Sequence, residues 1–224
     1  VSEYVMKPID YEEMQSLLKK MYQELDKEYN DKINRARLEN AYAQSLPLLR
    51  QQFFSQLMTE PMEENECIQQ ITNLKLDLSD SVYSVIAVKV GKEEQKDVLS
   101  ELSMKETLKE ALEKIANVHE FGMGDKEVFL LGGSKRYEIG KITRSIQETA
   151  VMIKRIFGVG ISCGISNSGV CLKDMPMLYA QAAEALEYNL VLPEESYTYY
   201  NDIMPLQDMK EDWNAQVEMI GKSI

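Results

Sequence analysis

Apolar positions in the first part of the chain are widely spaced among charged residues, a pattern typical of an exposed helix. Residues 11–45 contain no Gly or Pro, and apolar side chains recur there at the 4-3-4 spacing of a heptad seam. The seam consists of Met14, Leu18, Met21 and Leu25, continued after a phase shift by Tyr29 and Ile33. The pattern predicts a helical linker over residues 11–45 that forms a parallel coiled coil with a second copy; a single helix lying along its own domain is the alternative.

Pro47 predicts a helix boundary, because proline is tolerated in the first turn of a helix but not in its interior. We expect a new helix to begin there, with an apolar face wide enough to be buried in a domain or dimer contact. That face consists of Leu48, Leu49, Phe53, Phe54, Leu57 and Met58. A further helix is expected to begin at Pro61, with Ile68, Ile71 and Leu74 on one side. Residues 46–80 are thus predicted to be a helical connector.

From Val82 onward, apolar runs of strand length alternate with segments of helical period. Val82–Val90 and Val159–Ser166 are typical of strands buried on both faces. Phe121–Leu131 (FGMGDKEVFLL) lies in a predicted hairpin over Glu120–Leu131, whose turn dihedrals Gly122 and Gly124 permit. The remaining predicted elements are helices at Leu99–Val118, Ile139–Phe157 and Asp174–Leu190 and a last strand at Tyr197–Tyr200.

The resulting order, β-α-β-β-α-β-α-β over residues 81–203, predicts an α+β sandwich of ferredoxin-like character, in which helices cover an antiparallel sheet. Its expected core consists of Val85, Ile86, Val88, Phe129, Leu130, Ile161 and Ile165.

Composition narrows the classes of function. The 224 residues carry a net charge of −12, which disfavours binding of nucleic acid by this chain alone. Three cysteines without a Cys-x-x-Cys pair fit a reducing cytosol and argue against structural zinc. No apolar run is long enough for a membrane helix, and the first residues do not form a signal peptide. We therefore expect a cytoplasmic protein without metal or cofactor, with the only histidine, His119, at an ordinary helix end.

Residues 1–10 (VSEYVMKPID) contain an apolar strand end followed by Lys7-Pro8. This segment resembles the end of a response-regulator receiver domain, in which the last strand finishes in Lys-Pro and a helix follows. The resemblance implies that Lys7 matches the lysine that contacts the phosphoryl group of the receiver aspartate. The rest of a receiver is absent, and the chain lacks an initiator Met, so we expect an excised fragment.

Three segments of the later region resemble a GGDEF-type domain, the fold of diguanylate cyclases. They are Phe121–Leu131, Val159–Ser166 (VGISCGIS) and Ala182–Tyr188 (AAEALEY). The order of receiver end, coiled linker and cyclase-like domain resembles response regulators of the AraC class, in which two helix-turn-helix units follow. The resemblance implies that residues 204–224 form a helical segment leading to an output domain that is absent here.

The departures from the GGDEF pattern decide the expected function. Active cyclases bind two metal ions through an acidic residue on the first strand and another in the signature turn. Metal ions of this kind prefer hard oxygen ligands. The first strand here has no acid, and Lys126 reverses the charge of the acidic fourth signature position. The altered signature comprises Gly122, Gly124, Asp125, Lys126 and Glu127.

We therefore expect a non-catalytic signalling and dimerisation module that relays receiver phosphorylation, or an unknown small-molecule signal, to a transcriptional output domain. Expected partners are a second copy of the chain and, through domains missing here, a sensor histidine kinase and DNA. The alternatives are a diguanylate cyclase with unusual ligands, or a domain that binds a nucleotide at Gly122, Gly124 and Asp125 without turnover.

Overall fold

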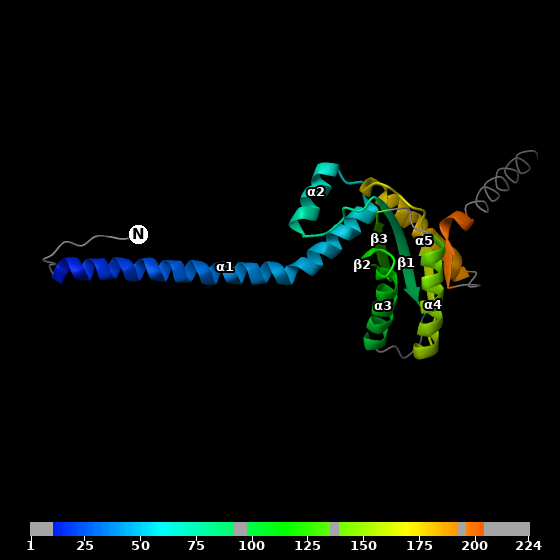
Figure 1. Ribbon diagram of the computed structural model, residues 1–224, viewed down its shortest axis with the longest axis horizontal. Helices are drawn as coiled ribbons and strands as arrows, with labels where there is room; N and C mark the ends of the chain where they lie inside the picture. Colours follow the sequence, from blue (N-terminus) through cyan, green and yellow to red (C-terminus); the bar gives the residue numbers. More distant parts are fainter. Residues whose placement is uncertain (1–10, 92–97, 135–138, 192–195, 204–224) are drawn as a thin grey trace, which may run out of the picture. The chain divides into compact units, whose positions relative to one another are not determined.

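The computed structural model describes residues 11–91, 98–134, 139–191 and 196–203. By its internal contacts the chain divides into two units, Val1–Leu49 and Arg50–Ile224. The expectations for Lys7 and Pro8, and for residues 204–224, lie outside the described residues. The second unit is an α+β fold built on a five-stranded sheet (Figure 1).

One long helix, α1 (Tyr11–Thr59), occupies 49 residues and contains Pro47 in its interior. The predicted boundary at Pro47 is therefore wrong. Proline removes one backbone donor from the helix, but the following turns contain no Pro or Gly and bury four large side chains, which favours continued helix. These buried side chains are Phe53, Phe54, Leu57 and Met58, whereas Leu48 and Leu49 are exposed, so the apolar face is narrower than expected.

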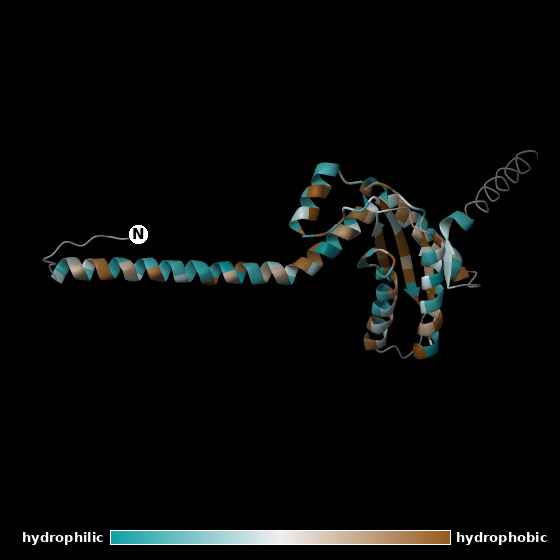
Figure 2. Cartoon of the chain, viewed as in Figure 1, coloured by the Kyte–Doolittle hydropathy of each residue, from teal (hydrophilic) through white to brown (hydrophobic). Residues whose placement is uncertain are grey.

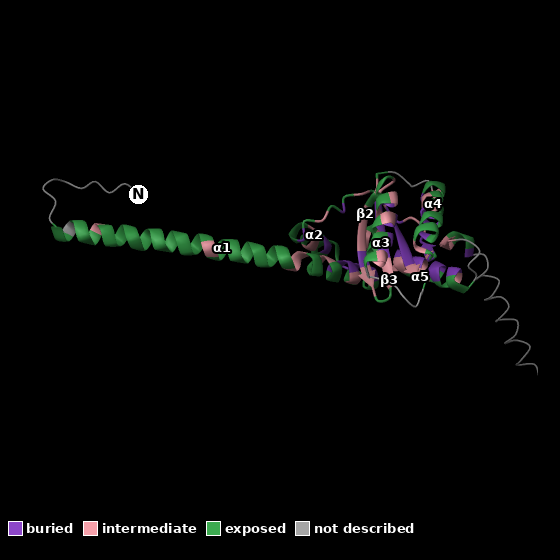
Figure 3. Cartoon of the chain, turned by 90° about the horizontal axis from the view of Figure 1, so that it is seen from below, coloured by how far each residue is buried: buried purple, intermediate pink, exposed green. Residues whose placement is uncertain are grey.

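The first 39 residues of α1 are largely polar and exposed (Figures 2 and 3). Five of the six seam positions are exposed, with Leu18 at 60% and Leu25 at 63%, and Ile33 is half-buried. The seam residues thus form an apolar stripe that the single chain leaves facing solvent.

Helix α2 (Glu64–Asn73) begins three residues after Pro61, so the predicted start at Pro61 is wrong. Glu63 occupies the N-cap position in an extended conformation. Cys67 and Leu74 are buried, whereas Ile68 is exposed. The guanidinium of Arg50 donates hydrogen bonds to the carbonyl oxygens of Leu74 (3.0 Å) and Lys75 (3.1 Å), which fastens the end of α2 to the last turns of α1.

The sheet has the order β2-β3-β1-β4-β5. Its strands are β1 (Val82–Val90), β2 (Asn117–Met123), β3 (Lys126–Gly133), β4 (Ile161–Ile165) and β5 (Tyr197–Tyr199). β1 is antiparallel to both of its neighbours, as predicted. β5 pairs parallel with β4, so the sheet is mixed rather than purely antiparallel. The predicted order of strands and helices from Val82 is confirmed.

Helices α3 (Val98–Glu113) and α4 (Ile139–Phe157) cover one face of the sheet. Ile86 and Val88 of β1 point into this layer, together with residues of α3 and α4. α3 ends before the predicted Val118, because the chain enters β2 at Asn117 and then follows a strand period. All seven residues of the expected core are buried: Val85, Ile86, Val88, Phe129, Leu130, Ile161 and Ile165.

The opposite face carries Val85 and Ala87 and is covered by α5 (Met175–Val191), which follows the short helix η1 (Leu172–Asp174). α5 lies close against β4 at Gly164, where an added Cβ would lie 2.1 Å from the carbonyl oxygen of Ala182. Any larger residue at Gly164 would push α5 off the sheet. On β2, Phe121 stacks on Phe54 of α1 with ring centroids 4.7 Å apart, so the last turns of α1 pack against the hairpin.

Candidate functional site

The turn that carries the altered signature joins β2 to β3 through Gly124 and Asp125, between the paired residues Met123 and Lys126. Gly124 has a φ of +65°, as the first central residue of a type II′ hairpin turn requires. The role predicted for Gly124 is confirmed. Gly122 lies inside β2 opposite Glu127, and its φ is not positive, so the turn role predicted for it is wrong.

Asp125 forms an ion pair with Lys89, the penultimate residue of β1, with Nζ 2.5 Å from Oδ2. The hydrogen bond from Lys89 lowers the pKa of Asp125, and the same bond raises the pKa of Lys89. The carboxylate is 68% exposed, so water screens the pair and its contribution to stability is small. The ion pair matters more for the chemistry of the turn than for stability. Asp125 is the only acid of the turn, and the ammonium of Lys89 already lies beside its carboxylate.

Lys126 and Glu127 point to opposite faces of the sheet, as neighbours on a strand do. Lys126 Nζ lies 2.9 Å from a carboxylate oxygen of Glu187 on α5. Glu127 lies on the α3 side, 2.7 Å from Lys105 Nζ, which also lies 3.3 Å from Glu101. Partial burial lowers the pKa of Lys105, but the hydrogen bonds and charges of Glu127 and Glu101 together raise it above the ordinary value.

Glu120 on β2 lies on the α3 side as well, 3.7 Å from Lys109. Burial, reinforced by the nearby charge of Glu127, raises the pKa of the Glu120 carboxyl. Charged side chains around the hairpin thus fall into two groups. The α5-side cluster is Lys89, Asp125, Lys126 and Glu187; the α3-side cluster is Glu101, Lys105, Lys109, Glu120 and Glu127.

This division determines what the hairpin can do chemically. A divalent cation needs several oxygen ligands converging on one point. Asp125 belongs to the α5-side cluster, where two lysines balance two carboxylates, and Glu127 belongs to the other cluster. Within the described ranges, no group of three or more His, Cys, Asp or Glu side chains is arranged to hold a metal ion. The arrangement favours a turn closed by internal ion pairs.

His119 lies on β2 rather than at a helix end, so that expectation is wrong. Its ring packs on Phe54 with centroids 5.5 Å apart, and Nε2 lies 2.9 Å from the carbonyl oxygen of Asp77. A carbonyl only accepts, so Nε2 carries the hydrogen in this contact. Burial lowers the pKa of His119, although the carbonyl of Asp77 opposes that shift. The imidazole therefore acts as a neutral packing group.

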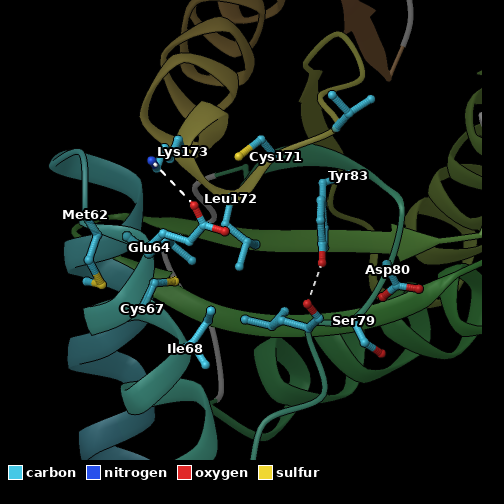
Figure 4. A pocket seen from close by; sticks show the side chains of 13 residues that line it. Met62, Glu64, Cys67, Ile68, Ser79, Asp80, Tyr83, Cys171, Leu172 and Lys173 are labelled. Atoms are coloured by element: carbon cyan, nitrogen blue, oxygen red, sulfur yellow. Dashed lines mark hydrogen bonds and ion pairs between the residues drawn. The ribbon is translucent and has the colours of Figure 1, made fainter.

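A second feature of the fold is a cavity of about 240 Å³, lined by residues that are distant in the sequence from the signature turn. Figure 4 shows its walls, which come from α1, α2, the segment before β1, β1 itself and the segment around η1. Sequence reasoning missed this site. In the sequence, Tyr83 and Cys67 could have indicated this site, but only the tertiary fold brings the two side chains to one cavity.

No protein-family model matches the chain, and the search of curated proteins finds no match. Among the described residues, no helix combines the length and the apolar character that crossing a bilayer requires.

The lowered pKa of His119 predicts how the stability of the fold depends on pH. Because its folded-state pKa lies below the ordinary 6.5, the unfolded chain binds more protons in the window between the two values. The free energy of unfolding should therefore fall as the pH is lowered from about 7.5 to 5.5, and His119→Gln should flatten that dependence. Urea unfolding at both pH values measures the effect.

The chain has a single histidine, so no other side chain of this type contributes in that window. The raised pKa of Glu120 has the opposite effect on the free energy of unfolding, which it increases as the pH falls, and this effect occurs at lower pH. Equal pH slopes in the wild type and the His119→Gln variant would show that the half-buried site does not lower the pKa of His119.

Proposed function

We propose that this chain is a non-catalytic signalling and dimerisation module of a DNA-binding response regulator, with a degenerate GGDEF-type domain at residues 81–203. In this role the module relays receiver phosphorylation, or a ligand signal, to an AraC-type output domain. The β-α-β-β-α-β order, the two-residue signature turn and the helix-covered sheet support the proposed relationship.

The ion pair between Lys89 and Asp125 is the observation on which the proposal chiefly rests. In the resembled cyclases, the first strand and the signature turn each supply an acid to bridging metals. Here the first strand supplies a lysine, whose ammonium lies on the remaining acid of the turn. A metal at this position would have to displace a covalently tethered cation and approach the ammonium of Lys126.

The dimer proposal rests on the apolar stripe of α1. Its exposed residues gain by removal from water, and a second copy in heptad register offers the simplest partner surface. α1 continues without interruption from this stripe to Phe54, which stacks on Phe121 of the hairpin. Paired output units need protomers held in register, which a dimer through α1 would provide.

The first prediction from this proposal concerns catalysis. The purified chain incubated with GTP and Mg²⁺ or Mn²⁺ should form no cyclic dinucleotide, because lysines occupy the positions that need metal ligands. Product formation can be followed by chromatography, with a heat-inactivated sample as the blank. Turnover above that blank would favour the alternative, a cyclase with unusual ligands.

The second prediction concerns self-association. Replacing Leu18 and Leu25 together with Glu places like charges along the stripe and should shift the chain towards monomer in sedimentation equilibrium. Association of the wild type should be modest and concentration-dependent, because Met occupies two of the first four seam positions.

The matched control replaces Ser16 and Gln23 with Glu, which adds the same charge at the same seven-residue separation but outside the seam. This control should associate like the wild type. A wild-type chain that stays monomeric at high concentration, or a control that dissociates equally, would contradict a seam-mediated dimer.

A further inference from the structure

The cavity of about 240 Å³ lies entirely within residues 50–224 and has an apolar interior. Leu57 of α1, Cys67 of α2 and Leu78 of the following segment line it and are 1%, 4% and 7% exposed. Tyr83 of β1 contributes its ring, and its hydroxyl donates to the carbonyl oxygen of Leu78 at 2.7 Å (Figure 4).

The most buried side chains of the cavity wall are uncharged. Burial raises the pKa of Tyr83 to about 12, so its hydroxyl keeps its proton, and burial likewise raises the pKa of the Cys67 thiol. Asp80 also lines the cavity, but its carboxylate packs over Gly132 and accepts a hydrogen bond from Asn117 at 3.2 Å. An anionic group in the interior would therefore lose its hydration and lie near the charge of Asp80 without gaining a cationic partner, and a cation would have to compete with Asn117 for that carboxylate.

The rim carries an ion pair between Glu64 at the start of α2 and Lys173 of η1. Lys173 Nζ lies 3.8 Å from Glu64 Oε2, too far for a direct hydrogen bond. Both side chains are more than half exposed, so the pair contributes little by itself. A hydroxyl group placed at the rim can complete it, by accepting from the ammonium and donating to the carboxylate.

We propose that this cavity is a binding site for a small uncharged molecule with an apolar body of monocyclic aromatic size and one hydroxyl group. A cavity of about 150 Å³ lined by apolar side chains is large enough for benzene. The larger volume here leaves room for a short substituent that carries the hydroxyl to Glu64 and Lys173. This site goes beyond the proposed signalling function and does not depend on it.

Binding at this site would join segments that are separate in the sequence. A ligand in the cavity contacts the last turns of α1 through Leu57, α2 through Cys67 and the segment before η1 through Val170. It therefore stabilises the arrangement of α1 and α2 within this unit, by mass action on the folded state.

Benzyl alcohol and toluene are the probes that test the site, titrated into the full 224-residue chain and followed by amide chemical shifts in NMR. Both should produce saturable shifts at the cavity residues Cys67, Ser79 and Val170. Benzyl alcohol should bind about three- to tenfold more tightly, the range expected for one net hydrogen bond. Benzylamine and benzoate, which carry charges, should both bind more weakly than benzyl alcohol.

Two variants, each with a control, test the ion pair at the rim and access through the mouth. Lys173→Met should abolish the preference for benzyl alcohol over toluene while toluene still binds, and Lys114→Met, outside the cavity, should leave the preference intact. Ile68→Trp places a bulky ring at the mouth and should weaken both probes. Val151→Trp on the exposed surface of α4 should weaken neither.

Because Ile68 and Val151 are both exposed, thermal unfolding should show that both tryptophan variants still fold. Absence of saturable shifts in the wild type would overturn the site. Tighter binding of benzylamine or benzoate than of benzyl alcohol, or an unchanged alcohol preference in Lys173→Met, would overturn the proposed class of ligand.

Discussion

Burial of β1 on both faces is the constraint from which the rest of the second unit follows. Val85 and Ile86, which point to opposite faces, are both fully buried, so the register of β1 against β3 and β4 is fixed. That register places Lys89 at the end of the strand on the side of α5, beside Asp125. A slip of one residue would exchange the side chains of β1 between the α5 side and the α3–α4 side, where they no longer match the packing, and would carry Lys89 to the other face. Core packing thus sets the electrostatics of the signature turn.

The last turns of α1 contact both the hairpin and the cavity. Phe54 stacks on Phe121 of the hairpin, and Leu57, less than one turn further on, forms part of the cavity wall. Arg50 holds the end of α2 through two backbone carbonyls. A ligand in the cavity and a change in α1 would therefore act on the same short helical segment.

Sequence patterns predicted the strands and their order well, because long β-branched runs such as Val82–Val90 have few other stable placements. Pro47 was misjudged because its local cost is outweighed by packing that only the fold reveals. The hairpin itself was predicted, but its ion pairs were not, since Lys89 and Asp125 are 36 positions apart and Lys126 and Glu187 are 61 apart. The cavity could not be predicted for the same reason, since the segments that line it are distant in the sequence.

In the proposed module, the ammonium of Lys89 occupies the position beside Asp125 that a metal ion would take at the signature turn. Mn²⁺ titration, followed by paramagnetic broadening of the amide signals of Gly124 and Asp125, measures this most directly. The wild type should show no selective, saturable broadening at the turn, whereas Lys89→Asp, which frees Asp125 and adds a carboxylate, should show more. Saturable broadening centred on Gly124 and Asp125 in the wild type would contradict the account.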